Sequence, residues 1–300
     1  MSRGLYFLAN DGTYELAVAF LNSVRAHNPH LPVCLIPFDD HVSKLMSLQP
    51  RYAFSVFSNQ DTLRQCDTIS RRFHERTMGH YRKLAAWEGE FDEFFYIDVD
   101  TVVLADLGFA FDFLSGLDFL ASHSRLPELV RWVWKPSIRG AGALSEPQIA
   151  YSANTGFLGS RRGVLSIREL DAQLAGAVAL ADHMEFYCVE QPVLNFLIVT
   201  SGKRYSSLLE IWRETRNPQA LLEHWAGNIQ EGIRVEGGRL TFEGRPAPVM
   251  LVHWAGLWKS PAVDGARVQE DAGSHEGMPV FAVDPMMPLY DLWNYYRCLA

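Results

Sequence analysis

Short apolar runs alternate with helical periodicity near the start of the chain, and this alternation constrains the fold more than any other feature. Leu5–Ala9, Val33–Phe38 and Phe94–Ile97 are continuous apolar runs, which is typical of strands buried on both faces of a sheet. Residues 16–24 carry apolar side chains at helical spacing, and Ala53–Phe57 is a further strand candidate. This order predicts an α/β fold with a single Rossmann-like sheet, mixed but mostly parallel, flanked by helices.

The rest of the chain continues the α/β pattern. Residues 61–91 are mostly helical in pattern with a break at Met78-Gly79, and residues 125–150 are predicted to be a long loop because prolines and glycines interrupt a polar and aromatic mixture. We expect further strands, a hairpin centred on Gly237-Gly238, and helices. The strands are Leu117–Ser122, Gly156–Gly159 and Val249–Val252, the hairpin is Ile233–Phe242, and the helices are Val164–Val178, Phe186–Val199 and Tyr290–Leu299.

Composition narrows the class of protein. The chain has 300 residues, 48% of them hydrophobic, which suits one large domain, and we expect it over residues 1–260 with a C-terminal extension over residues 261–300 whose short helix packs on it. The formal net charge of -8 disfavours a nucleic-acid surface. The sequence shows no transmembrane segment, no signal peptide and no paired cysteine motif, so a cytoplasmic protein with reduced thiols is expected.

Asp98-Val99-Asp100 follows the apolar run Phe94–Ile97 directly and is the first candidate site. Aspartate is disfavoured in strands and a buried unpaired carboxylate is costly, so two of them at this position require an explanation. Ligands of open α/β sheets bind beyond the carboxyl ends of the strands. Alternate residues of a strand share a face, so both carboxylates can converge on one Mg²⁺ or Mn²⁺ ion.

Two other interpretations of this motif remain open. Paired aspartates can simply cap the next segment from a solvated turn. Phosphotransferases of the haloacid-dehalogenase type also place an aspartate motif after an apolar strand, with the first aspartate, here Asp98, as nucleophile. Their motif has a threonine two residues after the second aspartate, whereas Thr101 follows Asp100 directly.

A second candidate site follows the last predicted core strand, at His253-Trp254-Ala255-Gly256-Leu257-Trp258-Lys259. An imidazole can be a third ligand to a borderline metal such as Mn²⁺. Glycine at position 256 allows the backbone to approach a diphosphate closely, and Lys259 supplies a positive charge to phosphates. Together with the aspartate motif, this spacing indicates a two-part metal and diphosphate site.

With these motifs in view, the chain resembles the family 8-type glycosyltransferases of GT-A fold, the group of glycogenin and the bacterial lipopolysaccharide galactosyl- and glucosyltransferases. The resemblance spans about residues 4–260 and depends on five pieces in the family's order. Each piece is weak, but the ordered set is specific. They are Lys83–Trp87, Asp98–Leu104, Asn154–Gly156, Glu190–Asn195 and His253–Lys259.

The resemblance implies a nucleotide-sugar-dependent catalytic domain with bound Mn²⁺, or Mg²⁺ in its place. Asp100 and His253 would ligate the metal, and Asp98 would share it and contact the ribose. Gly256 and Lys259 would hold the diphosphate.

It also implies the contacts to the rest of the donor. The nucleoside would lie against the residues after the first strand, which are Ala9, Asn10, Asp11 and Tyr14. Lys83 would contact donor phosphate or sugar, with Arg82 beside it. Asn154 and Glu190 would grip the sugar hydroxyls, and Gln191 would face the anomeric carbon.

The implied reaction moves a hexose from a UDP-linked or similar nucleotide sugar to a hydroxyl of a saccharide, glycolipid or protein, with retention of configuration. The sequence departs from the family at Glu190, where aspartate is usual, and at Ser260, where proline is usual. A phosphotransferase that uses Asp98, and a nucleotide-sugar-binding protein without catalysis, remain as alternatives.

Overall fold

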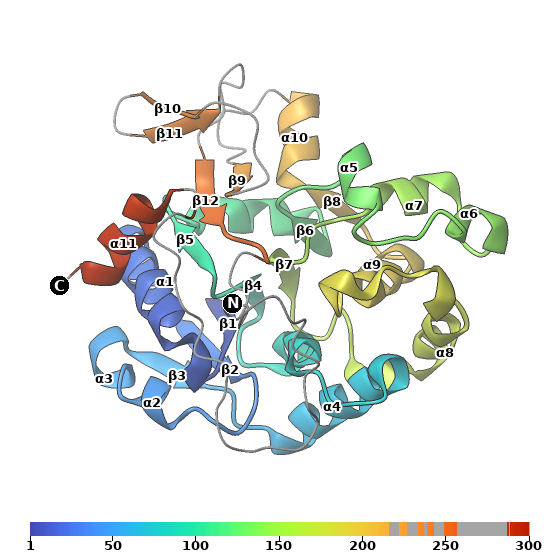
Figure 1. Ribbon diagram of the computed structural model, residues 1–300, viewed down its shortest axis with the longest axis horizontal. Helices are drawn as coiled ribbons and strands as arrows, with labels where there is room; N and C mark the ends of the chain where they lie inside the picture. The colour runs from blue at the N-terminus through green and yellow to red at the C-terminus, as the bar shows by residue number, and fades with distance from the viewer. Residues whose placement is uncertain are drawn as a thin grey trace, which may run out of the picture.

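The computed structural model describes residues 1–215, 222–226, 233–236, 239–242, 249–256, 287 and 289–299. A seven-stranded sheet with the order β3-β2-β1-β4-β7-β6-β8 forms its centre (Figure 1). Only β7 runs antiparallel to its neighbours β4 and β6, and the other adjacent pairs are parallel. The predicted mixed, mostly parallel α/β sheet is therefore confirmed.

The strands of this sheet agree closely with the apolar runs of the sequence. They are β1 (Arg3–Ala9), β2 (Val33–Pro37), β3 (Phe54–Val56), β4 (Glu93–Ile97), β6 (Phe119–Ala121), β7 (Phe157–Arg161) and β8 (Tyr205–Ser207). The longer helices are α1 (Tyr14–His27), α4 (Gln60–His74), α8 (Asp171–Ala179), α9 (Gln191–Thr200), α10 (Leu208–Thr215) and α11 (Tyr290–Cys298), and shorter ones are α2 (Ser43–Met46), α3 (Gln49–Tyr52) and the 3-10 helices η2 (Gly79–Glu88) and η3 (Gly108–Ser115).

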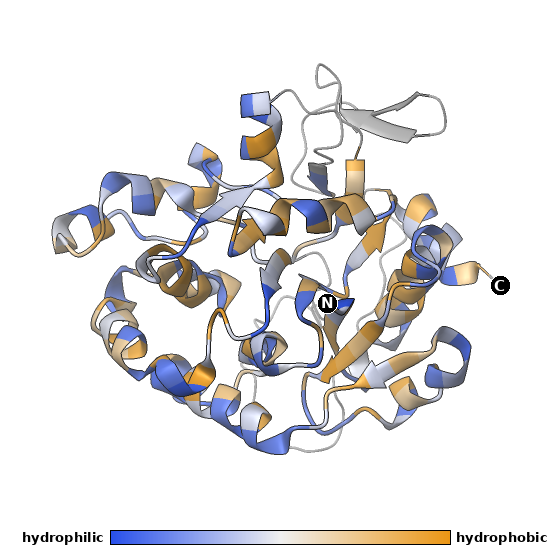
Figure 2. Cartoon of the chain, turned by 180° about the vertical axis from the view of Figure 1, so that it is seen from behind, coloured by the Kyte–Doolittle hydropathy of each residue, from blue (hydrophilic) through white to orange (hydrophobic). Residues whose placement is uncertain are grey.

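Apolar side chains cover both faces of the sheet, because successive residues of a strand point to opposite sides. On one face, Tyr6 and Leu8 of β1 pack in the same cluster as residues of α4, η2, α8 and α9. On the other face, Leu5 and Phe7 pack with residues of α1, α3 and η3. Figure 2 shows hydrophobic residues along the strands and on the adjoining sides of the helices. This two-sided burial explains why the strands are almost continuously apolar.

A smaller three-stranded sheet, with the order β5-β12-β9, lies against the central one. It consists of β5 (Thr101–Val103), β9 (Leu222–Trp225) and β12 (Val249–His253). β12 runs antiparallel to β5 and parallel to β9. The chain turns directly from β4 of the large sheet into β5 of the small one, so the two sheets meet at the carboxyl end of β4. The predicted hairpin is present as the antiparallel pair β10 (Ile233–Glu236) and β11 (Arg239–Phe242).

Helix α11, near the end of the chain, packs against α1 (Figure 1). The Asn22 amide donates to the Tyr296 carbonyl oxygen at 2.7 Å, and a ring nitrogen of His27 lies 2.8 Å from the Tyr296 hydroxyl. Arg297 forms an ion pair with Glu15 at 2.7 Å. These contacts join the two ends of the described chain.

Three sequence predictions of local structure are wrong in whole or in part. The predicted helix Phe186–Val199 begins only at Gln191, because a 3-10 turn (Phe186–Cys188) and Val189, with a φ of 46°, come before it. The predicted loop 125–150 contains the helices α5 (Pro127–Val130), α6 (Ile138–Ala141) and α7 (Glu146–Tyr151). Proline in the first turn of α5 and the Ser145–Gln148 capping box of α7 are helix-start signals that apolar periodicity does not register. The predicted helix Val164–Val178 begins only at Asp171, because Gly163 turns the chain with a φ of 74° and a single 3-10 turn, η4 (Ile167–Glu169), follows.

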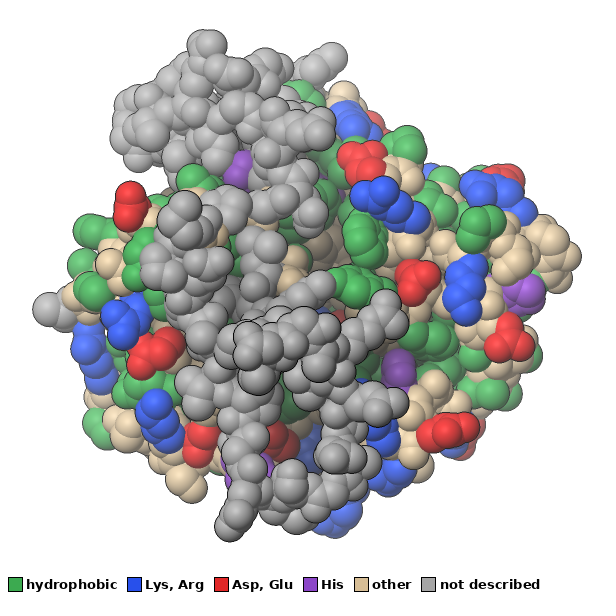
Figure 3. Space-filling view, in the orientation of Figure 1, with side chains coloured by type: hydrophobic (Ala, Val, Ile, Leu, Met, Phe, Trp, Pro, Cys, Tyr) green, Lys and Arg blue, Asp and Glu red, His purple; other side chains and the backbone are tan. Residues whose placement is uncertain are grey.

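The surface carries charges of both signs, and the cysteines are unpaired, as the composition led us to expect. On the described part of the face in Figure 3, Lys and Arg side chains are interspersed with Asp and Glu. All four cysteines are free thiols, namely Cys34, Cys66, Cys188 and Cys298. Among the helices that the structure describes, none has the length and apolar character needed to cross a bilayer.

Candidate functional site

Asp98, Asp100 and His253 come together where the two sheets meet. The aspartates lie in the turn between β4 and β5, not within a strand as the sequence argument assumed, so the turn and not strand alternation directs them to one point. Strand β12 places His253 opposite Thr101 of β5. His253 Nε2 lies 3.0 Å from Asp100 Oδ1 and 3.9 Å from Asp98 Oδ2, and one ligand atom from each residue lies within 4.8 Å of the others.

This donor set suits a divalent cation. Two carboxylates and one imidazole are ligands that Mn²⁺ accepts readily, and Mg²⁺ prefers the carboxylates. The backbone leaves little room around the imidazole: a Cβ at Gly156 would come within 2.4 Å of His253 Cε1. Glycine in the Asn-Thr-Gly segment is therefore required for His253 to occupy this position.

Glu223 lies behind His253, and sequence reasoning missed it. This side chain of β9 is completely buried, and its Oε1 lies 2.5 Å from His253 Nδ1. Its Oε1 also accepts from Trp225 Nε1 at 2.7 Å, and its Oε2 accepts from the Ser122 hydroxyl. No motif contains Glu223, and its sequence position within a short strand offered no signal of a site.

Lys83 connects the cluster of Asp98, Asp100 and His253 to helix α9. Its ammonium is almost completely buried, 2.9 Å from Asp98 Oδ1 and 2.5 Å from Glu190 Oε1. The Tyr96 hydroxyl donates to Asp98 Oδ1 at 2.7 Å. Burial opposes the charge on Lys83, but Asp98 and Glu190 outweigh it and raise the pKa of the ammonium.

The connected groups carry an excess of negative charge. Among the described residues, the four carboxylates of Asp98, Asp100, Glu190 and Glu223 form ion pairs with two basic groups, Lys83 and His253. Even with His253 protonated, these six described groups have a formal charge of -2. A divalent cation would neutralise that charge.

The pKa shifts in the cluster show that neighbouring opposite charges outweigh the effect of burial. Burial alone would lower the pKa of His253, but Asp100 and Glu223 hold it well above its usual value. Burial alone would raise the pKa of Asp98 and of Glu223, yet Lys83 and His253 lower the first and His253 lowers the second. All three shifts have the same cause, which is that opposite charges lie next to one another in a buried cluster.

The segment before β7 and the start of α9 bring three further predicted residues to the same place. Gln191 Oε1 accepts from the Thr155 amide at 3.2 Å, and Gln191 Nε2 donates to the Trp132 carbonyl oxygen at 3.1 Å. Asn154 Oδ1 accepts from the Gly156 amide at 2.6 Å. Glu190 accepts from the Thr155 hydroxyl at 3.3 Å as well as pairing with Lys83.

Asn195 fixes this arrangement and was given no role by the sequence. Its side chain accepts from the Ala153 amide at 2.7 Å and donates to the Ala153 and Gln191 carbonyl oxygens at 2.9 and 3.0 Å. Asn195 lies in the Glu190–Asn195 motif, so the resemblance was the signal that could have identified it.

The residues predicted to hold a nucleoside follow β1 at the same edge. Strand β1 is parallel to β4 and adjacent to it, so Ala9 and Asn10 leave the sheet on the side from which Asp98 leaves. Asn10 Nδ2 donates to Asp39 Oδ2 at 2.7 Å, and Asp11 Oδ1 accepts from the Leu45 amide at 3.0 Å.

Tyr14 is the fourth residue predicted to contact the nucleoside, and the Lys44 ammonium lies 4.1 Å from the centre of its ring.

The remaining predicted contacts have three different outcomes. Gly256 lies just after β12 with a φ of 72°, a conformation that favours glycine. Lys259 lies outside the described residues. Arg82 does not assist Lys83, because its guanidinium forms a bidentate ion pair with Asp67, at 2.8 and 2.9 Å, and donates to the Pro37 carbonyl oxygen at 3.1 Å.

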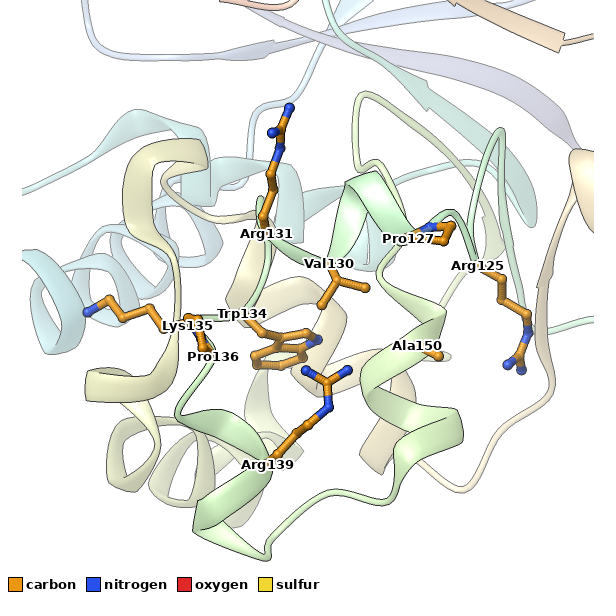
Figure 4. Close-up of a pocket in the computed structure, with 9 residues that line it drawn as sticks. All are labelled: Arg125, Pro127, Val130, Arg131, Trp134, Lys135, Pro136, Arg139 and Ala150. Carbon is orange, nitrogen blue, oxygen red and sulfur yellow. The ribbon is translucent and has the colours of Figure 1, made fainter.

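A cavity of about 440 Å³ lies beside α5 and α6, and Asp98, Asp100 and His253 are not among the residues that line it. Trp134, Val130 and Ala150 contribute its apolar lining. Figure 4 shows the Arg139 guanidinium beside the Trp134 ring, whereas the charged ends of Arg125, Arg131 and Lys135 point away. Because Arg139 also pairs with Glu146, this lining offers an occupant little unpaired charge.

Comparisons with known proteins identify the fold. No family model and no curated protein matches the sequence. The structure is similar to the bifunctional glycosyltransferase WbbM, with 14% identity, a TM-score of 0.58 and coverage of 99% of this chain but only 50% of WbbM.

The galactosyltransferase LgtC, solved with donor and acceptor sugar analogs, has 15% identity and a TM-score of 0.51, with 87% of this chain and 90% of LgtC covered. An active-site mutant of LgtC has a TM-score of 0.53 at 15% identity, with 89% of this chain and 92% of that one covered. The fold expected from the sequence motifs is confirmed: this chain has the GT-A fold of these glycosyltransferases.

Proposed function

We propose that this chain is a metal-dependent glycosyltransferase that transfers a hexose from a nucleoside diphosphate sugar, with UDP as the carrier, to an acceptor hydroxyl. The observation that carries the proposal is the convergence of Asp98, Asp100 and His253 at the carboxyl edge of a GT-A fold. The excess negative charge of the connected carboxylates supports Mn²⁺, or Mg²⁺, as the partner of this site.

The proposed donor lies along the carboxyl edge of the sheet. Ala9, Asn10, Asp11 and Tyr14 hold the nucleoside, Asp98 contacts the ribose, and Gly256 and Lys259 hold the diphosphate. A divalent ion bound by Asp98, Asp100 and His253 supplies positive charge for the diphosphate that leaves. Lys83 adds a fixed ammonium next to Asp98.

The sugar is proposed to lie between Asn154, Glu190 and Gln191, with Gln191 next to the anomeric carbon. The hydrogen bonds of Gln191 to Thr155 and Trp132 fix its side chain in orientation. Glu190 is paired with Lys83 and so is poorly suited to act as a covalent nucleophile. We therefore propose front-face attack by the acceptor hydroxyl, with retention of configuration.

The other two candidate functions have less support. Asp98 as the nucleophile of a phosphotransferase would have to attack with an oxygen, yet Oδ1 is held by Tyr96 and Lys83 and Oδ2 lies 3.3 Å from the Lys83 ammonium. A binding protein without catalysis would not require the arrangement of Gln191 beside the cluster. A trapped aspartyl-phosphate would favour the first alternative, and donor binding without hydrolysis or transfer the second.

Asp100→Ala is the direct test of the proposal. It removes one predicted metal ligand from a partly exposed turn, so we expect a folded protein whose Mn²⁺-dependent hydrolysis of UDP-hexoses falls by at least about 100-fold, the scale of losing a major transition-state charge contact. Release of UDP with and without EDTA measures this, and circular dichroism checks the fold. Turnover equal to that of the wild type, or turnover that EDTA does not reduce, would contradict the assignment.

An acceptor site is proposed at Trp132. Its carbonyl oxygen accepts from Gln191, and its ring lies 5.5 Å from that of Tyr187, which is 58% exposed. Trp134, the other tryptophan of the segment, is buried in the core. An aromatic face beside the reacting centre suits a sugar ring or another amphipathic acceptor.

Trp132→Ala therefore should weaken transfer more than donor hydrolysis. We expect KM for the acceptor to rise by about 10-fold, equivalent to about 1.4 kcal/mol of lost contact, with hydrolysis in the absence of acceptor unchanged. Steady-state kinetics with and without acceptor separate the two effects. An equal loss of both activities would place Trp132 at the donor site or in the fold instead.

A further inference from the structure

Glu223 is a buried carboxylate that no predicted role uses. It lies on β9, next to β12 in the small sheet, where Glu223 pairs with Leu251 and Trp225 pairs with His253. It is outside every motif of the resemblance, and its side chain is completely buried. An ionised side chain in such a position is costly unless several donors satisfy it.

Four donors surround this carboxylate. His253 Nδ1 lies 2.5 Å from Oε1, and Trp225 Nε1 donates to the same oxygen at 2.7 Å. The Ser122 hydroxyl donates to Oε2, and Asn154 Nδ2 donates to Oε1 at 3.5 Å. The carboxylate is therefore held from several sides and acts on the His253 ring from a fixed position.

We propose that Glu223 is the positioning residue of the metal site: it holds His253 with Nδ1 protonated, so that Nε2 is the nitrogen presented to the metal. Nε2 is the nitrogen that faces Asp98 and Asp100. This inference depends on the proposed metal-dependent function. A carboxylate on the second nitrogen fixes the tautomer and orientation of a metal-binding histidine and makes its free nitrogen a better ligand.

Two neighbours support this role. A side chain larger than that of Gly156 would meet the His253 ring, so the ring is confined on that side while Glu223 holds its Nδ1. Asn154 contacts both Glu223 and the Gly156 amide, which connects the positioning carboxylate to a predicted sugar contact. The structure thus joins β9, β12 and the segment before β7 in one hydrogen-bonded unit behind the metal site.

Glu223→Gln tests the inference because it keeps the shape of the side chain and removes its charge. Mn²⁺ alone is the probe, and electron paramagnetic resonance of free Mn²⁺ measures its affinity without turnover. We expect the affinity to fall by about 10- to 100-fold, the usual effect of losing such a partner. Ser122→Ala, which removes only the Oε2 donor, should lower the affinity by less than Glu223→Gln does.

Asp118→Asn is the matched control. Asp118 is also a buried, ion-paired carboxylate, but it lies at the other end of β6, bound to Arg161 and Arg204. The Asp118→Asn variant should bind Mn²⁺ with wild-type affinity, although thermal unfolding of the metal-free variant will show a loss of stability. A merely structural role for Glu223 would produce the same pattern as this control.

The outcomes are distinguishable. Unchanged Mn²⁺ affinity in Glu223→Gln would overturn the positioning role, and so would a loss as complete as that in Asp100→Ala, which would make Glu223 a ligand itself. If Glu223→Gln does not fold, Ser122→Ala decides: weaker Mn²⁺ binding supports the role and unchanged binding overturns it. A wild-type protein that does not bind Mn²⁺ would contradict the proposed function, and the inference would fall with it.

Discussion

The two edges of the central sheet differ in how their charges are matched. At the amino edge, each acidic side chain of the ion pairs has an arginine partner: Glu93 pairs with Arg3, Asp92 with Arg162, and Asp118 with both Arg161 and Arg204. At the carboxyl edge, Arg82–Asp67 and Arg125–Glu210 are matched in the same way, but in the cluster at the end of β4 four carboxylates share Lys83 and His253 among the described residues. Within the part of the chain that the structure describes, the amino-edge carboxylates are thus matched by arginine, and those of this cluster outnumber their cations.

This difference is the one expected between a structural charge network and the proposed metal site. Unbalanced carboxylates that are held close together repel one another, and they persist only where the rest of the fold holds them in place. A site prepared for a divalent cation requires that imbalance, because ligands already neutralised by arginine would bind the ion weakly. The carboxylates of Asp100 and Glu223 beside His253 also raise the pKa of its imidazole well above the usual value.

Lys83→Met should have the largest effect on stability, because it deprives Asp98 and Glu190 of their shared cation. We expect the metal-free protein to lose about 3–5 kcal/mol of unfolding free energy, the usual effect of breaking a buried ion pair from one side. Urea unfolding measures the change. The control is Arg162→Met at the amino edge, where both Arg162 and its partner Asp92 are in contact with water and a loss of less than about 1 kcal/mol is expected. Equal losses would remove the distinction between the edges.

Mn²⁺ binding should give the next largest change in the free energy of unfolding, and this change should depend on the ligands at the carboxyl edge. A ligand that binds the native state alone stabilises it, by about 2.7 kcal/mol at a free concentration of 100 times Kd. Thermal unfolding should therefore shift upward with Mn²⁺ in the wild type and remain unchanged in Asp100→Ala. An equal shift in both proteins would mean that the ion binds elsewhere.

Asp118→Asn should cause the smallest of the three changes in the free energy of unfolding. It leaves Arg161 and Arg204 without their carboxylate, but both guanidinium groups are partly exposed and water can solvate them, so we expect a loss of about 1–2 kcal/mol. Mn²⁺ should stabilise this variant as much as the wild type, which differential scanning calorimetry with and without the ion can show. A reduced metal response would extend the functional network to the amino edge.

The sequence alone predicted much of the fold because its signals are local. Strands buried on both faces leave continuous apolar runs, as in β1 and β4, and a charged motif that interrupts such a run, as Asp98 and Asp100 do, marks a sheet edge. The helices of residues 125–150 were missed because α5 and α6 are each only four residues long, too short for an apolar period to appear.

Only the tertiary structure decided which charges meet. Glu223 and His253 are 30 residues apart, and Ser122 and Glu223 are 101 apart, so no spacing rule connects them. The sequence determined that Asp98, Asp100 and His253 are candidate ligands, since their residue types and strand-end positions are local properties. Their common orientation and the carboxylate behind His253 depend on the pairing of β5, β12 and β9, because long-range strand pairing sets which side chains are neighbours.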